Sequence, residues 1–288
     1  MRFGYFPGCS LKSTAKEFDL TIKALCEIFG IELVEIKDWI CCGATPVYSI
    51  NEELSLALPL HNLINAEEEG LLEVLSPCPA CYSHMLTSHN VATQNTLQAE
   101  ELRQIIGRSY KGTVKVYHLL DFLSEKINID TLKSSLKRPL KGLKVVSYYG
   151  CFTRLHAVEL EDKENPTLMD TILDAIGAEP LYWSHKTECC GATLSLSRTE
   201  IALRLGGDIL DSARSVGADC ICVVCPLCQS NLDSRQREIE QKSKTSFNIP
   251  VVYLSQLILL ALGKDYKELL FDKHIVDPAL LLEKVSTL

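Results

Sequence analysis

Ten of the thirteen cysteines in this chain form two series with the same internal order. Each series has a single cysteine, then an adjacent Cys-Cys pair followed by Gly-Ala, and then a Cys-Pro-x-Cys motif. The first cysteine set is Cys9, Cys41, Cys42, Cys78 and Cys81. The second cysteine set is Cys151, Cys189, Cys190, Cys225 and Cys228. Corresponding members lie 142 to 148 residues apart, so the chain contains a duplicated unit.

Five thiols in each unit indicate metal or redox chemistry. The chain begins without the charged and apolar regions of a secretory signal peptide, so we expect a cytoplasmic protein. Reducing conditions there disfavour structural disulfides. Short apolar runs precede each Cys-Pro-x-Cys motif, which predicts a strand leading into a helix. The positive end of a helix dipole favours thiolate over thiol, and thiolates bind metals.

Three kinds of site fit this pattern, and the spacing alone leaves them open. A structural zinc ion takes four ligands, so five thiolates leave one surplus. A thioredoxin-like dithiol would use only the Cys-Pro-x-Cys motif and leave the other cysteines without a role. An iron–sulfur cluster uses many thiolates, although a cubane needs only four. Adjacent cysteines suit neighbouring irons of a larger, opened cluster better than one small ion.

The elements that must position these cysteines alternate between strand and helix. Residues 14–30 predict a helix with a capping box at Thr14 and Glu17, ended by Gly30 and followed by a strand at 31–36. In the second copy, Asn165 is the expected N-cap and Pro166 the first helical residue. Pro59 interrupts the helical pattern of residues 52–68, where we expect a break or kink.

Strands separated by helices predict parallel sheets covered by helices. We therefore expect an α/β protein with two similar domains related by internal duplication, each a small parallel sheet flanked by helices. The expected N-terminal domain is 1–138 and the expected C-terminal domain is 139–288. The boundary falls in the basic stretch 133–144, whose Pro139 and Gly142 suit a connector.

Composition excludes several other classes of protein. A hydrophobic content of 47 %, a charged content of 23 % and only 15 glycines and 11 prolines exclude a disordered or collagenous chain. The 29 Lys plus Arg against 37 Asp plus Glu give a net charge of −8, which argues against nucleic-acid binding. The longest apolar stretch, 250–263, is shorter than a membrane helix needs, so no membrane span is expected.

The pattern Cys-x31-Cys-Cys-Gly-x34-Cys-x2-Cys of the first copy, which the second copy repeats with slightly different spacings, is similar to the cysteine-rich CCG domain. Two such domains filling the chain resemble the B-type subunit of heterodisulfide reductase, including bacterial or sulfur-oxidising relatives of it. Segments 6–10, 164–168 and 186–192 support the resemblance. The second copy has one residue fewer between its Cys-Cys pair and its Cys-Pro-x-Cys motif, for which we expect a loop adjustment without loss of ligation.

The resemblance implies a cofactor, a reaction and partners. Each cysteine set would hold one noncubane 4Fe-4S cluster through five thiolates, and a disulfide or heterodisulfide would be reduced or formed between the two clusters. A ferredoxin-like partner with cubane 4Fe-4S clusters would supply electrons, and it would receive them from a flavin-containing partner. The alternative is an electron-relay subunit, as in lactate- or glycerol-phosphate-oxidising complexes, without disulfide chemistry of its own.

For each remaining candidate residue, a functional role is weighed against a simple position at the surface or in the core. His84 and His156 lie near motif cysteines and are candidate proton donors to a product thiolate. Lys12, Arg154 and Lys186 fit solvated surface positions better than a substrate site. Three cysteines outside the sets are expected to be buried apolar residues and not ligands. They are Cys26, Cys220 and Cys222.

Overall fold

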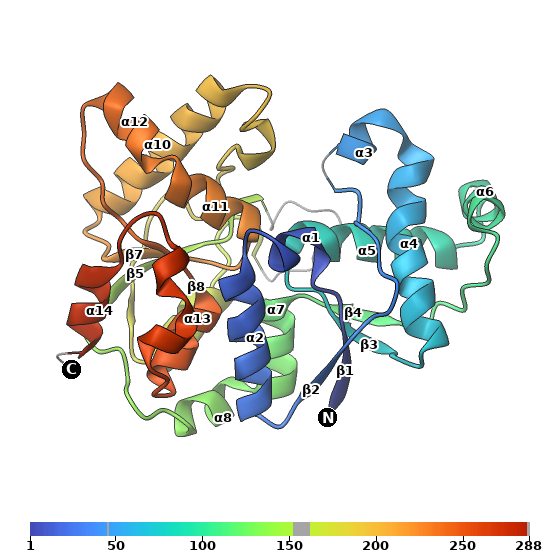
Figure 1. Ribbon diagram of the computed structural model, residues 1–288, viewed down its shortest axis with the longest axis horizontal. Helices are drawn as coiled ribbons and strands as arrows, with labels where there is room; N and C mark the ends of the chain where they lie inside the picture. Colours follow the sequence, from blue (N-terminus) through green and yellow to red (C-terminus); the bar gives the residue numbers. More distant parts are fainter. Residues whose placement is uncertain (45, 152–161, 287–288) are drawn as a thin grey trace.

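The computed structural model describes residues 1–44, 46–151 and 162–286, and it contains two four-stranded parallel sheets (Figure 1). The first sheet has the order β2-β1-β3-β4, and the second has the equivalent order β6-β5-β7-β8. The strands of the first sheet are β1 (Arg2–Tyr5), β2 (Glu32–Glu35), β3 (Glu73–Leu75) and β4 (Lys115–Tyr117). Those of the second are β5 (Lys144–Tyr148), β6 (Glu179–Pro180), β7 (Cys220–Val223) and β8 (Val251–Tyr253).

Helices connect the strands, as parallel pairing requires. The first half contains α1 (Gly8–Lys12), α2 (Lys16–Ile28), α3 (Pro46–Ile50), α4 (Glu52–Glu68), α5 (Pro79–Thr93), α6 (Leu97–Ile106), α7 (Leu119–Phe122), η1 (Leu123–Ile127) and α8 (Ile129–Ser134). The second contains α9 (Leu168–Ala175), η3 (Ala192–Leu194), α10 (Thr199–Ser215), α11 (Pro226–Ser234), α12 (Gln236–Ser243), α13 (Leu254–Ala261), η4 (Tyr266–Leu269), η5 (Phe271–Lys273) and α14 (Ala279–Ser286). The predicted α/β architecture with an internal duplication is therefore confirmed.

The strand register shows the same duplication residue by residue. Tyr5 of β1 pairs with Leu75 of β3, and Ser147 of β5 pairs with Cys222 of β7. Corresponding partners are 142 and 147 residues apart in the two copies, the same offsets as the cysteines that follow the strands. The two copies therefore place their cysteines at corresponding points of corresponding sheets.

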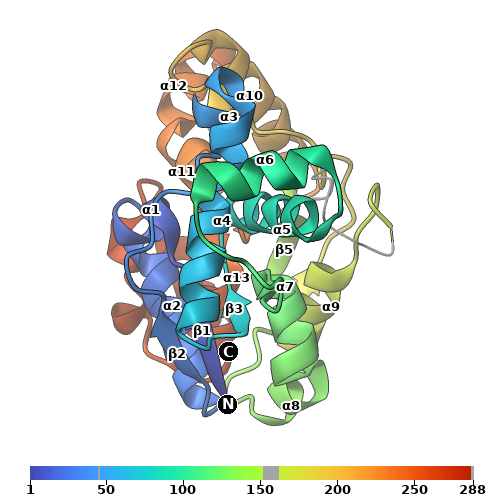
Figure 2. The ribbon, with the colours of Figure 1, turned by 90° about the vertical axis from the view of Figure 1, so that its right-hand side faces the viewer.

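The two halves pack through one helix from each, α2 and α13, which lie side by side (Figure 1). Phe18 of α2 stacks on Tyr253 with ring centroids 4.3 Å apart and planes 8° from parallel. The Thr21 and Ser255 hydroxyls form a buried hydrogen bond of 2.7 Å. Helices α8 and α9 form a second contact between the halves (Figure 2). The aromatic stack and the buried bond give this interface the character of a core.

Two predicted helix starts are wrong, and both differences have local reasons. Helix α2 begins at Lys16 with Ala15 as its N-cap, because the chain turns tightly after α1 and the Ala15 N–H donates to the Ser10 carbonyl oxygen (2.9 Å). Helix α9 begins at Leu168, two residues later than expected. The Asn165 side chain accepts from the Lys186 ammonium group (3.4 Å) and does not cap the helix.

The expected break at Pro59 does not occur, because α4 continues through this buried proline. Proline removes one backbone donor from the helix. Helix α5 packs along α4, and its Ser88 hydroxyl donates to the Leu56 carbonyl oxygen in the turn before the proline (2.9 Å). Packing of this kind stabilises a helix more than local propensity does.

Candidate functional site

Both cysteine sets lie at the carboxyl ends of three neighbouring strands. In the first half, Cys9 follows β1, the Cys-Cys pair follows β2, and Cys78 follows β3. The sheet order β2-β1-β3 means that the chain reverses its direction across the sheet at β1. Such a switch point is where open parallel sheets bind ligands. The second set occupies the same positions after β5, β6 and β7.

The Cys-Pro-x-Cys motifs begin helices. Cys78 is the N-cap of α5 and Cys225 is the N-cap of α11, each followed by proline in the first turn. Proline suits this place because its missing N–H would be unpaired there anyway. The dipoles of these helices favour negative charge on the adjacent sulfur atoms.

Short sulfur contacts connect the first cysteine set. The Cys42 and Cys81 sulfur atoms lie 3.2 Å apart. Hydrogen bonds from the Cys41 and Cys81 thiols, followed by the Ala44 N–H, hold the pKa of Cys42 far below its usual value, although burial opposes this. A hydrogen bond from Cys81 likewise lowers the pKa of Cys78 against the effect of burial. These contacts favour the thiolate form of Cys42 and Cys78.

The second cysteine set repeats this arrangement. The Cys190 and Cys228 sulfur atoms lie 3.6 Å apart. The hydrogen bond from Cys228 lowers the pKa of Cys190, with burial opposing it and the Ala192 N–H adding to it. Hydrogen bonding to Cys189 and then burial raise the pKa of Cys151. The structure therefore brings the members of each set together, and all thirteen cysteines are free thiols.

Each set is buried at its base and open to solvent at its mouth. The buried members are Cys42, Cys78, Cys81, Cys190 and Cys228. The exposed members are Cys9, Cys41, Cys151 and Cys189, with Cys225 half-buried. Each set therefore combines buried sulfur atoms, which can hold a bulky group, with exposed sulfur atoms, which solvent or another molecule can reach.

Two glycines leave room beside the buried sulfur atoms. Gly8 has φ +66°, and a Cβ atom there would lie 3.0 Å from the Cys81 sulfur. Gly150 has φ +59°, and a Cβ atom there would lie 3.3 Å from the Cys228 sulfur. Glycine is favoured here both by the left-handed backbone and by the close sulfur atom.

Within the described parts of the chain, the sulfur atoms do not surround a single point. Among those residues, no group of three or more His, Cys, Asp or Glu side chains has the arrangement of a site for one metal ion. Five cysteines per set, with one pair of sulfur atoms 3.2 or 3.6 Å apart in each, suit a polynuclear cluster better than a tetrahedral zinc site.

The two sets face a common interface. Burial first, then the charges of Glu17, Cys225 and Cys78, raise the pKa of Tyr253, so this side chain is close to a cysteine of each set. Its buried hydroxyl has no hydrogen-bond partner among the described residues. Helix α1, which carries Cys9, also contacts α11. The packing of the two halves therefore brings a helix of the first set into contact with a helix of the second.

The cysteines outside the sets lie in the hydrophobic core. Cys26 lies on the buried face of α2, and Cys220 and Cys222 lie within β7. Burial raises the pKa of Cys26 to about 12 and raises those of Cys220 and Cys222. These thiols stay protonated and apolar.

Two of the other candidate residues lie within the described part of the chain, and two do not. His84 lies half-buried on α5, and its charge would lower the pKa of Cys42. Lys12 lies at the surface and pairs with Glu35 (2.6 Å). His156 and Arg154 fall outside the described residues.

The surface position predicted for Lys186 is wrong. Lys186 is buried, pairs with Asp170 (2.8 Å) and donates to the Pro166 carbonyl oxygen (3.1 Å). Its own carbonyl oxygen accepts the Tyr149 and Gly150 N–H groups (2.9 and 3.2 Å), directly before Cys151. Lys186 therefore positions the loop that carries Cys151. In the sequence, only its place three residues before Cys189 connects it with the second set.

Replacing Lys186 with methionine should lower the free energy of unfolding by about 3 kcal/mol, because the half-buried Asp170 carboxylate then loses its charged partner and keeps only the hydrogen bond from Ser147 (2.8 Å). The matched change Lys12→Met breaks an exposed pair and should cost less than about 1 kcal/mol. Urea unfolding of the anaerobically prepared proteins measures both. Equal small losses would contradict the structural role given to Lys186.

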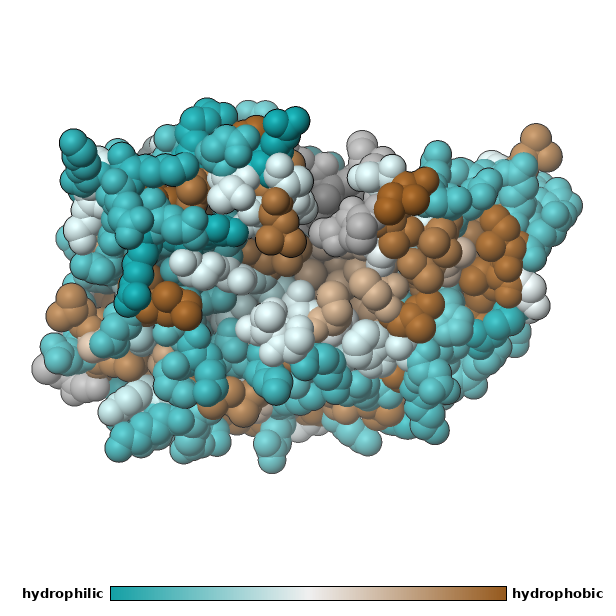
Figure 3. Space-filling view, turned by 45° about the horizontal axis from the view of Figure 1, so that its top comes forward, coloured by the Kyte–Doolittle hydropathy of each residue, from teal (hydrophilic) through white to brown (hydrophobic). Residues whose placement is uncertain are grey.

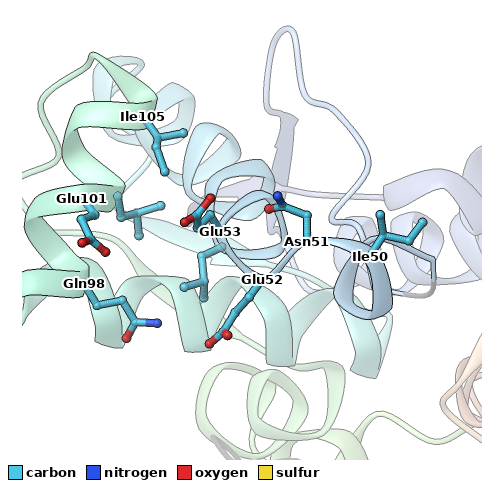
Figure 4. A pocket seen from close by; sticks show the side chains of 9 residues that line it. Ile50, Asn51, Glu52, Glu53, Gln98, Glu101 and Ile105 are labelled. Atoms are coloured by element: carbon cyan, nitrogen blue, oxygen red, sulfur yellow. The ribbon is translucent and has the colours of Figure 1, made fainter.

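The surface also has a hollow away from the cysteines, between α3, α4 and α6 (Figure 4). It has a volume of about 400 Å³ and carries acidic side chains beside aliphatic ones. Apolar side chains gather over the same helices (Figure 3), with Ile50 81 % and Leu97 79 % exposed. The first cysteine set lies at the strand ends and not in this hollow, so the thiol chemistry belongs elsewhere.

The fold and the two cysteine sets define a duplicated, cysteine-rich α/β protein. The domain family described as "CCG: Cysteine-rich domain" matches residues 3–86 and 145–233. The chain belongs to this family and carries its domain twice. This confirms the resemblance to the heterodisulfide reductase family that the cysteine spacing indicated.

Curated relatives match nearly the whole chain. The chain is 33 % identical to the "8-methylmenaquinol:fumarate reductase membrane anchor subunit" of Wolinella succinogenes, over 96 % of this chain and 97 % of that one. It is 29 % identical to the B-type subunit of the "Ferredoxin/F(420)H(2)-dependent CoB-CoM heterodisulfide reductase" of Methanosarcina acetivorans, over 99 % and 97 %. A protein of Archaeoglobus profundus, named for its likeness to the same type of subunit, is 27 % identical over 92 % of both chains. These relatives support an iron–sulfur redox subunit of a larger complex, and the fumarate reductase relative was not expected from the sequence.

One solved structure shares the fold. A hypothetical protein from Helicobacter pylori superposes with a TM-score of 0.77 at 14 % identity, over 96 % of this chain and 52 % of that one. The chain therefore spans about half of that structure. In the three segments that the structure describes, no helix is both long and apolar enough to cross a bilayer.

Proposed function

We propose that this chain is the disulfide-converting subunit of a heterodisulfide-reductase-like complex. Each cysteine set holds one noncubane 4Fe-4S cluster, and a disulfide or heterodisulfide is reduced, or formed in the reverse direction, between them. The observation that carries the proposal is the pair of five-thiol sets at corresponding strand ends, each linked by short sulfur contacts. Five sulfur ligands exceed the four that a zinc ion or a cubane cluster requires.

The residues present fit such a cofactor. Hydrogen bonds from neighbouring thiols lower the pKa of Cys42, Cys78 and Cys190, which favours the deprotonated form that binds iron. Gly8 and Gly150 leave space beside the buried sulfur atoms. The backbone N–H groups of Gly43 and Gly191 point at the sulfur atoms of Cys41 and Cys189 at 3.5 and 3.3 Å, and such bonds tune a bound cluster.

Converting a disulfide into two thiols takes two electrons and two protons. When bound, each cluster would supply a one-electron centre and a Lewis-acidic iron for one of the two sulfur atoms. The chain contributes the placement, because α1, which carries Cys9, contacts α11, which carries Cys228, where the two halves pack. His84 and His156 remain the candidate proton donors.

Electrons would come from partner proteins in the complex. We expect a ferredoxin-like partner with cubane 4Fe-4S clusters, supplied in turn by a flavin-containing partner, in the cytoplasm. The relatives support a complex, since they are named as subunits of heterodisulfide reductase and fumarate reductase. The disulfide substrate itself would be a small molecule that reaches the exposed cysteines at the mouths of the two sets.

The second candidate function is an electron relay without its own disulfide chemistry. The relative that is 33 % identical and named as a subunit of a quinol:fumarate reductase favours it. The relay of lactate- or glycerol-phosphate-oxidising complexes is a role of the same kind. Both candidates require the same cofactors and differ only in what reaches the space between the two sets.

One anaerobic preparation of the full chain tests both candidates. We expect about eight irons and matching sulfide per chain, together with disulfide cleavage driven by an artificial one-electron donor such as reduced methyl viologen. Clusters without turnover of any tested disulfide would favour the relay. Zinc without sulfide would refute both candidates.

Replacing Gly8 with alanine should lower the iron content of the purified chain, because the new methyl group would press on the Cys81 sulfur. Gly30→Ala is the matched control, since Gly30 has nearly the same φ (+65°) and open space around it. Both changes carry a backbone cost of about 1 kcal/mol, but only the first should reduce iron. Equal iron content in the two variants would contradict the fit of the cofactor beside Gly8.

A further inference from the structure

The two cysteine sets differ in one aromatic side chain beside their buried sulfur atoms. Phe6 and Tyr148 each lie three residues before the first cysteine of a set, and both are fully buried. A Cβ atom at Gly8 would lie 3.5 Å from the Phe6 ring, and one at Gly150 would lie 3.2 Å from the Tyr148 hydroxyl. The two rings therefore occupy corresponding places, and only the second carries a hydroxyl group.

The Tyr148 hydroxyl lies against the loop of the second set. It donates to the Glu188 carbonyl oxygen at 2.7 Å, directly before Cys189. The hydroxyl also lies beside the buried sulfur atoms, because the point next to Gly150 that is 3.2 Å from the hydroxyl is 3.3 Å from the Cys228 sulfur, and it interacts with Cys190 as well.

The corresponding place in the first set has no donor of this kind. Phe6 packs edge-on against Trp39, with ring centroids 5.5 Å apart. Cys42, the counterpart of Cys190, has the Cys81 sulfur 3.2 Å away. The side chain that distinguishes the two sets most directly at the buried sulfur atoms is therefore the tyrosine.

A hydrogen bond to a thiolate ligand affects electron affinity. A charged acceptor makes a shorter and stronger hydrogen bond than a neutral one, so ligated Cys190 competes well with the Glu188 carbonyl oxygen for the Tyr148 proton. Hydrogen bonds to the sulfur atoms of an iron–sulfur cluster help to set its potential. By withdrawing charge from the sulfur, such a bond stabilises the reduced, more negative state.

We propose that Tyr148 makes the second cysteine set the site of higher reduction potential, so that the first electron delivered to the chain resides there. This inference rests on the proposed function, because it presupposes a cluster in each set. It adds that the duplicated sites are unequal, and it names the residue responsible. Tyr148 acts through a ligand sulfur and is therefore a tuning residue.

Three variants of the full chain test the inference, using redox titration followed by electron paramagnetic resonance. Tyr148→Phe should shift the second-set signal to lower potential and leave the first unchanged. Phe6→Tyr should shift the first-set signal to higher potential. Tyr149→Phe is the matched control, because its hydroxyl is equally buried but accepts the Met169 N–H (2.6 Å) instead of contacting the set. It should shift neither signal.

The two signals are assigned with Cys42→Ala and Cys190→Ala, each of which retains one set. Unchanged potentials in Tyr148→Phe at full iron content would overturn the inference while leaving the proposed function intact. An equal shift in Tyr149→Phe would overturn it as well. If Tyr148→Phe loses iron, the inference is tested by Phe6→Tyr alone. A shift of the first-set signal to higher potential supports the inference, and no shift or a shift to lower potential overturns it. Wild-type protein without iron and sulfide would overturn the proposed function and, with it, the inference.

Discussion

Replacing Cys42 or Cys190 with alanine should remove about half of the iron and lower disulfide turnover by about 100-fold or more. Each of these residues is buried and in contact with a second sulfur atom of its set. Its loss leaves four cysteines, which are too few for the proposed five-ligand cluster. Turnover should fall in both variants because both sulfur atoms of the substrate must be stabilised together.

Cys26→Ala and Cys222→Ala are the matched controls, since both residues are as buried as the proposed ligands but lie in the core. Both should retain full iron content. Iron and sulfide analysis and a disulfide assay measure all four variants. Wild-type turnover in either ligand variant would rule out a mechanism that needs two centres, and loss of half the iron in a control would revise the ligand assignment.

Replacing Phe18 with alanine should lower the free energy of unfolding by about 3 to 5 kcal/mol. Phe18 is completely buried and stacks on Tyr253 across the contact between the halves. Its truncation leaves a cavity and removes an aromatic stack where α2 and α13 meet. The midpoint of urea unfolding measures the loss.

Leu20→Ala on the same helix is the control, because Leu20 is 38 % exposed and its truncation should cost less than about 1 kcal/mol. If Phe18→Ala were no more destabilising than this control, the two halves would not depend on the stack. The effect on turnover should exceed the effect on iron content in Phe18→Ala, since each set lies within one half while the substrate needs both.

The duplication, the parallel sheets and the position of the cysteines at strand ends could be predicted from the sequence. These features follow from local patterns and from spacing that repeats along the chain. The sheet order then explains why cysteines from three separate segments meet, because the carboxyl ends of neighbouring parallel strands lie at one edge.

Other features depend on partners that are distant in the sequence. Lys186 is buried because Asp170 and the Pro166 carbonyl oxygen meet its ammonium group. Pro59 stays within an unbroken helix because α5 packs along it. No local pattern indicates such contacts. The fourth strands of the two copies are aligned by their register, which pairs Tyr117 with Leu75 and Val252 with Cys222, so His118 is the counterpart of Tyr253.

Diffraction from anaerobically grown crystals, measured at the iron absorption edge, tests the central claim most directly. The account predicts two separate groups of iron atoms in each chain, one over each cysteine set, with sulfur from all five members of the set in contact. Iron over one set only, or a single zinc ion bound by four of the cysteines, would contradict it.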